Sequence, residues 1–196
     1  MDAFVKVKEH ALDILRNKLS DKLYYHSIDH TLGVYDVCNE YIERDKIDRH
    51  RAELLRIGAL THDIGFTVSN KNHEEHGVVI TTEIMEKYGY TDDEITLVAG
   101  LIMATKIPQS PKTDLERIIC DADLDYLGGD EFYEISNQLF KELREFGVID
   151  SIDDWNKAQI NFLEKHHYHT DFAIEHREPE KQKRLTELKQ AVINSG

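Results

Sequence analysis

Apolar residues recur every three or four positions along nearly the whole chain, and this spacing constrains the fold more than any other feature. The first such stretch predicts a helix over about residues 3–19, whose apolar face is formed by Phe4, Val7, Ala11 and Ile14. The strict alternation that is typical of half-buried β-strands is nearly absent. The spacing therefore predicts an all-α bundle.

The same pattern, with its stop signals, predicts the remaining helices. Four of them precede the break at "IPQSPK" and cover about residues 28–45, 49–62, 72–88 and 92–105. A sixth helix opens with a capping box between Thr113 and Glu116 and is expected to reach Leu127, where two glycines stop it. Two or three more are expected within residues 130–192, the last of them starting at Pro179.

Size and composition suit a single helical domain over residues 1–196. Of the 196 residues 40% are hydrophobic, which is enough for one buried core. No stretch has the composition of a linker, a repeat or a low-complexity segment. Cys38 and Cys120 are too few for a disulfide framework and too far apart for a cysteine zinc site. Both are expected to be reduced core residues.

The chain is acidic, which limits its partners. A net charge of −14 repels nucleic-acid backbones and disfavours an anionic membrane surface. No stretch approaches the roughly 20 apolar residues of a membrane span, and the first residues lack the apolar core of a signal peptide. We therefore expect a cytoplasmic protein that binds neither nucleic-acid polymers nor membranes. A small phosphorylated ligand is still allowed, because a bound cation can reverse the local field.

Four of the predicted helices carry ionisable residues on their apolar faces. These residues are His30 on the second helix, His62 and Asp63 at the end of the third, His73 on the fourth and Asp123 on the sixth. On the sixth helix Asp121 and Asp125 fall off the apolar stripe that contains Asp123. Buried groups of this kind must pair, form hydrogen bonds or coordinate a metal. Imidazoles and carboxylates from facing helices suit a divalent first-row metal.

Each of these residues also has a simpler explanation. His73 would be a hydrogen-bonded core histidine, Asp63 would cap a helix end, and Asp123 would pair with Arg117 or Lys106. A His-Asp pair alone is weak evidence for a metal site. If there is no metal site, however, all of these simpler explanations must hold at the same time. The spacing by itself leaves both the metal site and these alternatives open.

Three stretches resemble the HD superfamily of metal-dependent phosphohydrolases: "YYHSIDHTLGVYDV", "LTHDIG" and "IICDADLDYLG". The resemblance covers about residues 20–130, and the helices over about 130–196 are expected to pack on this core. The superfamily signature is a histidine, a His-Asp pair and a distant aspartate, which implies the metal ligands His30, His62, Asp63 and Asp123. The assignment of the last ligand to Asp123 agrees with the apolar stripe.

The resemblance implies a divalent cofactor, which would be Mn, Fe, Co, Ni or Zn, with Mg as a further option. Some members of the superfamily hold a second ion, with the aspartate of the His-Asp pair as a bridge between the two. Here His73 lies in a suitable place, but Thr105 and Lys106 stand where such members have another histidine pair. One ion is therefore expected, and a second ion beside His73 stays an alternative.

The expected chemistry is hydrolysis by a metal-activated water. Asp63 would orient that water, and His73 would transfer protons. Lys106 and Lys71 are the cations expected to bind a substrate phosphate, although both also suit ordinary surface lysines. Glu74 and Glu75 are expected to form a solvated helix start. The histidines of "HHYH", residues 166–169, are expected to be solvated or to pack in the core, and their role is left open.

The leading hypothesis is a phosphohydrolase that cleaves a phosphomonoester or phosphodiester bond of a nucleotide. A module on the same fold that senses a nucleotide without hydrolysing it is the alternative, and all four signature residues argue against it. A dinuclear-iron oxygenase is disfavoured by the absence of the second histidine pair near Thr105. The sequence leaves open the substrate, the metal and the oligomeric state, with a homodimer among the options.

Overall fold

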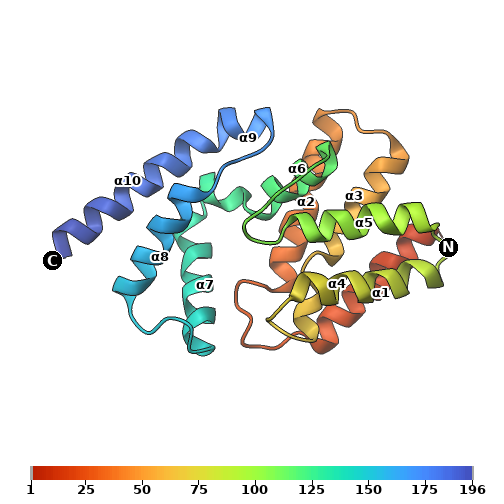
Figure 1. The fold of residues 1–196 in the computed structure, drawn as a ribbon, viewed down its shortest axis with the longest axis horizontal. Helices are drawn as coiled ribbons and strands as arrows, with labels where there is room; N and C mark the ends of the chain where they lie inside the picture. The colour runs from red at the N-terminus through yellow and green to blue at the C-terminus, as the bar shows by residue number, and fades with distance from the viewer. Residues whose placement is uncertain (1, 196) are drawn as a thin grey trace. The chain divides into compact units, whose positions relative to one another are not determined.

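The computed structural model describes residues 2–195, and this part of the chain is helical with no β-strand (Figure 1). The predicted all-α class is confirmed. Among these residues no helix is both long and apolar enough to cross a membrane. The chain divides between Asp123 and Leu124 into two compact units. That the C-terminal helices pack on the metal-binding core stays a prediction.

The N-terminal unit contains six α-helices and one 3₁₀ helix. Their bounds are α1 Ala3–Lys18, α2 Ile28–Arg44, α3 Arg49–Thr61, η1 Ile64–Thr67, α4 His73–Lys87, α5 Asp92–Ala104 and α6 Asp114–Asp123. The first five α-helices match the predicted ranges to within one residue at each end. A capping box opens α5, since the side chains of Thr91 and Glu94 each accept a hydrogen bond from the other residue's backbone N–H group.

Helix α3 lies at the centre of this unit and is buried on most of its surface. It packs on α1, α2, α5 and α6, and Leu55, Ile57, Ala59 and Leu60 have no exposed surface. Close packing is possible at Gly58, where an added Cβ would lie only 2.8 Å from Leu101 Cδ1. The C-terminal end of α3 therefore brings His62 and Asp63 into the interior of the unit.

The sixth helix is shorter than predicted. Helix α6 ends at Asp123, because the backbone of Leu124 leaves the helical conformation with φ −112° and ψ 19°. A separate 3₁₀ helix, η2, follows over Asp125–Gly128; Gly128 is its last residue and Gly129 is its C-cap. The carbonyl oxygen of Leu124 accepts hydrogen bonds from the backbone N–H of Leu127 at 3.1 Å and from the Tyr168 hydroxyl at 3.1 Å. The prediction that this helix reaches Leu127 is therefore wrong.

The C-terminal unit contains η2 and four α-helices, where two or three were expected. The helices are α7 Phe132–Glu145, α8 Ile152–Lys165, α9 Asp171–His176 and α10 Glu178–Ser195. Pro179 lies in the first turn of α10, as predicted. The core of this unit includes Leu124, Leu127, Phe132, Leu163, Tyr168 and Leu185.

Candidate metal centre

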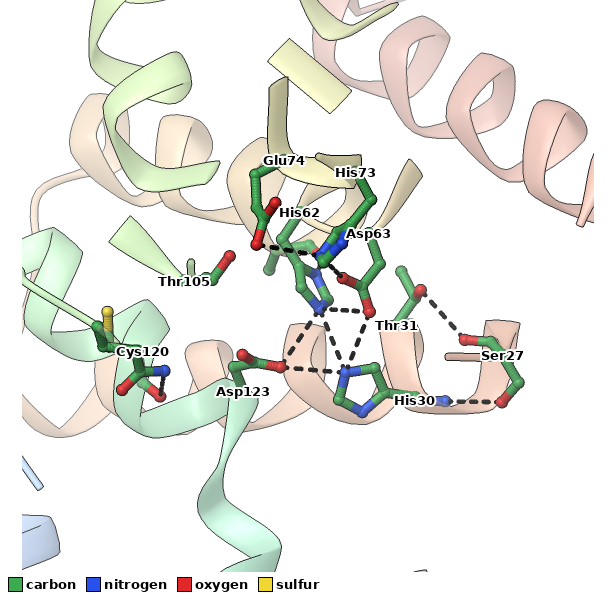
Figure 2. A network of polar contacts seen from close by, with 12 residues as sticks. Ser27, His30, Thr31, His62, Asp63, His73, Glu74, Thr105, Cys120 and Asp123 are labelled. Atoms are coloured by element: carbon green, nitrogen blue, oxygen red, sulfur yellow. Dashed lines mark hydrogen bonds and ion pairs between the residues drawn. The ribbon is translucent and has the colours of Figure 1, made fainter. Parts of the chain in front are cut away.

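His30 lies in the first turn of α2. Ser27 caps this helix, and its side chain accepts a hydrogen bond from the backbone N–H of His30 at 3.4 Å. The Thr31 hydroxyl donates to the backbone carbonyl of Ser27 at 3.2 Å. These two contacts fix the start of α2 and turn the His30 ring toward the end of α3 (Figure 2).

His62 and Asp63 follow the last residue of α3. The His62 ring is fully buried, and its Nδ1 atom lies 2.9 Å from the carbonyl oxygen of Ala59. That contact fits a proton on Nδ1 that is donated to the carbonyl oxygen. In a neutral ring the lone pair then lies on Nε2, which faces His30. The backbone of Asp63 leaves the helix with φ −103° and ψ 6°, and so its carboxylate points to the same place.

Asp123 completes the cluster from the last residue of α6 (Figure 2). Its Oδ1 atom lies 3.1 Å from His30 Nε2 and 3.5 Å from His62 Nε2. Neither Arg117 nor Lys106 is its partner, because Arg117 pairs with Asp114 and Lys106 pairs with Glu75. The simpler explanation for Asp123, an ordinary ion pair with one of these cations, is therefore wrong.

The donor atoms fit a metal ion. One atom each from His30, His62 and Asp123 lies within 4.8 Å of the other two, and among residues 2–195 this is the only such group of three or more potential ligands. Asp63 Oδ2 lies 3.2 Å from His62 Nε2 and 3.4 Å from His30 Nε2. This oxygen is buried and forms no hydrogen bond with the described residues. Two imidazoles and two carboxylates are a donor set that suits a divalent transition metal.

The electrostatics of the cluster support the same conclusion. Burial alone would lower the pKa of His62, but the negative charges of Asp63 and Asp123 raise it well above its usual value. Burial alone would raise the pKa of Asp63, but His62 and the other nearby histidines lower it. A proton on His62 thus offsets part of the charge of the two buried carboxylates. Metal coordination requires neutral imidazole, and so a divalent ion would replace protons here.

The comparison with protein families agrees with this geometry. Residues 27–125 match the HD domain, which is half of the chain and contains all four residues of the cluster. The chain belongs to the HD domain family. HD domains are typical of metal-dependent hydrolases. No curated protein and no solved structure matches the chain.

Asp121 of the HD domain is more deeply buried than the sequence indicated. It has no exposed surface, whereas the side chain of Asp123 is 14% exposed. Burial alone would thus have selected an aspartate other than the one that lies beside the histidines. Asp123 is the one that meets the histidines, because it is the last residue of α6 and lies where that helix approaches α2.

His73 lies beside the cluster, at the start of α4 (Figure 2). Its Nε2 atom is 3.5 Å from Asp63 Oδ1 and 3.5 Å from Glu74 Oε1. Asp63 therefore faces His30 and His62 with one oxygen and His73 with the other. Burial lowers the pKa of His73, and the two carboxylates oppose this effect only in part. His73 is then a neutral imidazole near pH 7, and can accept a proton.

Glu74 is buried, and so the expectation that it forms a solvated helix start is wrong. Its side chain is only 9% exposed and turns inward toward His73, whereas Glu75 is exposed. The reason is the tight contact between η1 and α4, which brings the first turn of α4 against the end of α3. Thr105 is buried nearby, and its hydroxyl donates to the carbonyl oxygen of Ile102.

His26 is a residue of this region that the sequence analysis did not single out. Its ring stacks on Phe66 with centroids 4.1 Å apart, and the His73 ring stacks on Phe66 at 4.0 Å. His26 is close enough for its charge to lower the pKa of Asp63. Its position in "YYHSIDH", four residues before His30 and just before the start of α2, was the available signal.

The two lysines expected to bind phosphate differ in their surroundings. Lys106 forms an ion pair with Glu75, and its pKa is raised by this hydrogen bond. Its side chain is 40% exposed, so it is accessible to a ligand. Lys71 is exposed on the segment before α4. That either lysine binds substrate stays a prediction.

Proposed function

We propose that this protein is a metal-dependent phosphohydrolase that cleaves a phosphomonoester or phosphodiester bond of a small substrate, with nucleotides as the expected class. The observation that carries the proposal is the convergence of His30, His62 and Asp123 within 4.8 Å, beside the unbonded oxygen of Asp63. His30, His62, Asp63 and Asp123 would hold one divalent ion. When bound, such an ion supplies a water of lowered pKa and offsets negative charge on the phosphoryl group.

Asp63 and His73 would carry the proton transfers. One carboxylate oxygen of Asp63 faces His30 and His62. The other oxygen would form the hydrogen bond that orients the attacking water. His73 Nε2 lies 3.5 Å from that second oxygen and accepts a proton from the same water. His26, on the opposite face of Phe66, is a second imidazole at the edge of the site and would donate a proton to the leaving oxygen.

Lys106 and Lys71 would bind the phosphate of the substrate. The site itself carries the carboxylates of Asp63, Asp123 and Glu74, and so an anionic substrate needs the ion and at least one lysine to balance the charge. Lys106 would exchange its ion pair with Glu75 for a contact with phosphate. Because the pair is exposed, that exchange costs little.

The test combines metal content with hydrolysis. Metal is measured by elemental analysis of the purified protein and of an Asp63→Ala variant, with Asp45→Ala as the control because Asp45 is an exposed residue at the end of α2. About one transition metal per chain, lost only in Asp63→Ala, is expected. Phosphate release from nucleotides and the cleavage of p-nitrophenyl phosphate and its diester then identify the bond that is broken.

Three other results would each argue against the phosphohydrolase. A protein that holds its metal and binds nucleotides without hydrolysing them would be a sensing module. Two iron ions per chain would favour the dinuclear oxygenase. No metal after incubation with manganese, cobalt or nickel would overturn the proposal.

A further inference from the structure

Two histidines at the edge of the metal centre share one aromatic neighbour. The ring of Phe66 stacks on the ring of His26 with centroids 4.1 Å apart, and on the ring of His73 with centroids 4.0 Å apart. In both pairs the ring planes differ by 26°, so each imidazole lies nearly flat against the phenyl ring. All three residues belong to the N-terminal unit.

The backbone of η1 fixes Phe66. Its backbone N–H donates to the carbonyl oxygen of Asp63 at 3.0 Å, and its side chain is only 9% exposed. The preceding residue, Gly65, lies so close to the first turn of α4 that an added Cβ would overlap the carbonyl oxygen of His73. The short turn after Asp63 therefore sets where the Phe66 ring lies relative to the backbone of His73.

The imidazole of His73 depends on its neighbours for its orientation. A histidine ring has only a broad preference for rotation about its Cβ–Cγ bond, so the rotamer alone does not fix the ring plane. The polar contacts of His73 Nε2, at 3.5 Å from Asp63 Oδ1 and 3.5 Å from Glu74 Oε1, are longer than a typical hydrogen bond. The face of Phe66 restrains the ring plane more tightly, because two stacked rings in contact leave little room for either one to turn.

The imidazole of His26 is held in the same way from a different element. His26 directly precedes Ser27, the N-cap of α2. Its ring meets the ring of Tyr25 edge to face, with centroids 4.7 Å apart, and meets Phe66 in the stack. Phe66 thus contacts one imidazole from the segment before α2 and one from the start of α4.

We propose that Phe66 is a positioning residue for His73 and His26. Its ring fixes the planes of both imidazoles and keeps His73 Nε2 directed at Asp63 Oδ1, beside the metal ligands. Phe66 has no polar side-chain atom, and so it acts only through the two histidines. The inference rests on the proposed function, in which these imidazoles transfer protons. An imidazole that turns out of line slows the reaction, because proton transfer requires the two atoms to be within hydrogen-bond reach.

The test compares Phe66→Leu with the unmodified chain, each loaded with manganese. Leucine keeps a bulky apolar side chain but has no ring face. Phe4→Leu is the matched control, because it makes the same change at a partly buried ring of α1 that packs on the core of the same unit. Phe66→Tyr keeps the ring face.

We expect Phe66→Leu to lower kcat for p-nitrophenyl phosphate or its diester by about 10-fold, with KM and manganese content unchanged. Phe4→Leu and Phe66→Tyr should keep the kcat of the unmodified chain. Far-UV circular dichroism establishes folding, and Phe66→Met, which also fills the space without a ring, replaces Phe66→Leu if that variant does not fold.

NMR of the metal-free chain follows the two imidazoles without any need for activity. The carbon-bound ring protons of His26 and His73, assigned with the variants His26→Gln and His73→Gln, lie against an aromatic ring whose current displaces their signals. In Phe66→Leu these signals should move toward the positions of unstacked histidines and broaden, because the rings then adopt more than one orientation. Phe66→Tyr should keep the signals of the unmodified chain.

An unchanged kcat in Phe66→Leu would overturn the positioning role, and so would an effect on KM alone. A fall in kcat matched by a loss of manganese would also overturn it, since Phe66 would then support the metal ligands. If the unmodified chain hydrolyses neither ester, the proposed function is overturned for these substrates and the NMR signals decide the inference. Unchanged signals in Phe66→Leu would then refute it, whereas displaced signals that Phe66→Tyr restores would support it.

Discussion

Gly65 provides the sharpest test of how the structure positions the site. It lies in η1, two residues after Asp63, where η1 packs on the first turn of α4. A Cβ at this position would lie 1.8 Å from the carbonyl oxygen of His73 and 2.6 Å from the backbone nitrogen of Gly77. Both neighbours are backbone atoms, so no side-chain rotation relieves the clash. Helix α4 or η1 would have to move by about 1.6 Å to restore even the shortest ordinary contact distance of 3.4 Å.

The Gly65→Ala variant should therefore lose about 3 kcal/mol of unfolding free energy. For a chain of this length that corresponds to a fall of about 6–12 °C in the unfolding midpoint. Gly33→Ala is the control, because Gly33 is exposed within α2 and an added Cβ there meets nothing within 4 Å. That change should raise stability by about 0.5–1 kcal/mol, the ordinary helix preference for alanine.

Thermal unfolding followed by circular dichroism at 222 nm measures both variants. Because the clash involves the backbone of His73 and lies close to Asp63, Gly65→Ala should also weaken metal binding, whereas Gly33→Ala should leave it unchanged. A Gly65→Ala protein that unfolds at the same temperature as the unmodified chain would refute the packing of η1 on α4.

Three further predictions concern capping, pH and thiol reactivity. Asp48 Oδ1 accepts hydrogen bonds from the backbone N–H groups of His50 and Arg51 at the start of α3. The Asp48→Ala variant should therefore lose about 1 kcal/mol of unfolding free energy, measured by denaturant unfolding, and no loss would argue against this cap. Burial, with the charge of Lys181, lowers the pKa of His166 from 6.5 to about 3. As the pH falls below 6.5, the unfolded chain therefore binds a proton at this residue that the folded chain does not bind. The free energy of unfolding should drop by about 2 kcal/mol between pH 7.5 and pH 5 through this residue. The His166→Asn variant should show a correspondingly smaller drop over the same range, and an equal drop would contradict the assignment. Burial raises the pKa of Cys38 and of Cys120, so neither thiol should react with Ellman's reagent at pH 8 until the protein is denatured, and rapid labelling of the native protein would show that they are accessible.

The helices and their buried faces could be predicted from the sequence because they depend on local spacing. Five α-helices of the N-terminal unit match the predicted ranges, and their stripes placed His62 and Asp63 on a buried face. His30 and Asp123 were assigned as ligands by resemblance and by the same stripes, and the structure brings both to the His-Asp pair. Periodicity determines which face of a helix is buried, and this is what the sequence supplied.

The tertiary structure decided what no local pattern contains. The spacing did not indicate that Asp121 is fully buried, that Glu74 turns inward, or that α6 ends four residues before Leu127. His26 became part of the site only through Phe66, which holds the rings of His26 and His73 on its two faces. Each of these features depends on groups that meet across the fold, such as His30 and Asp123, 93 positions apart. The sequence thus determined the helices and their buried sides, whereas the packing between helices determined which polar groups share one site.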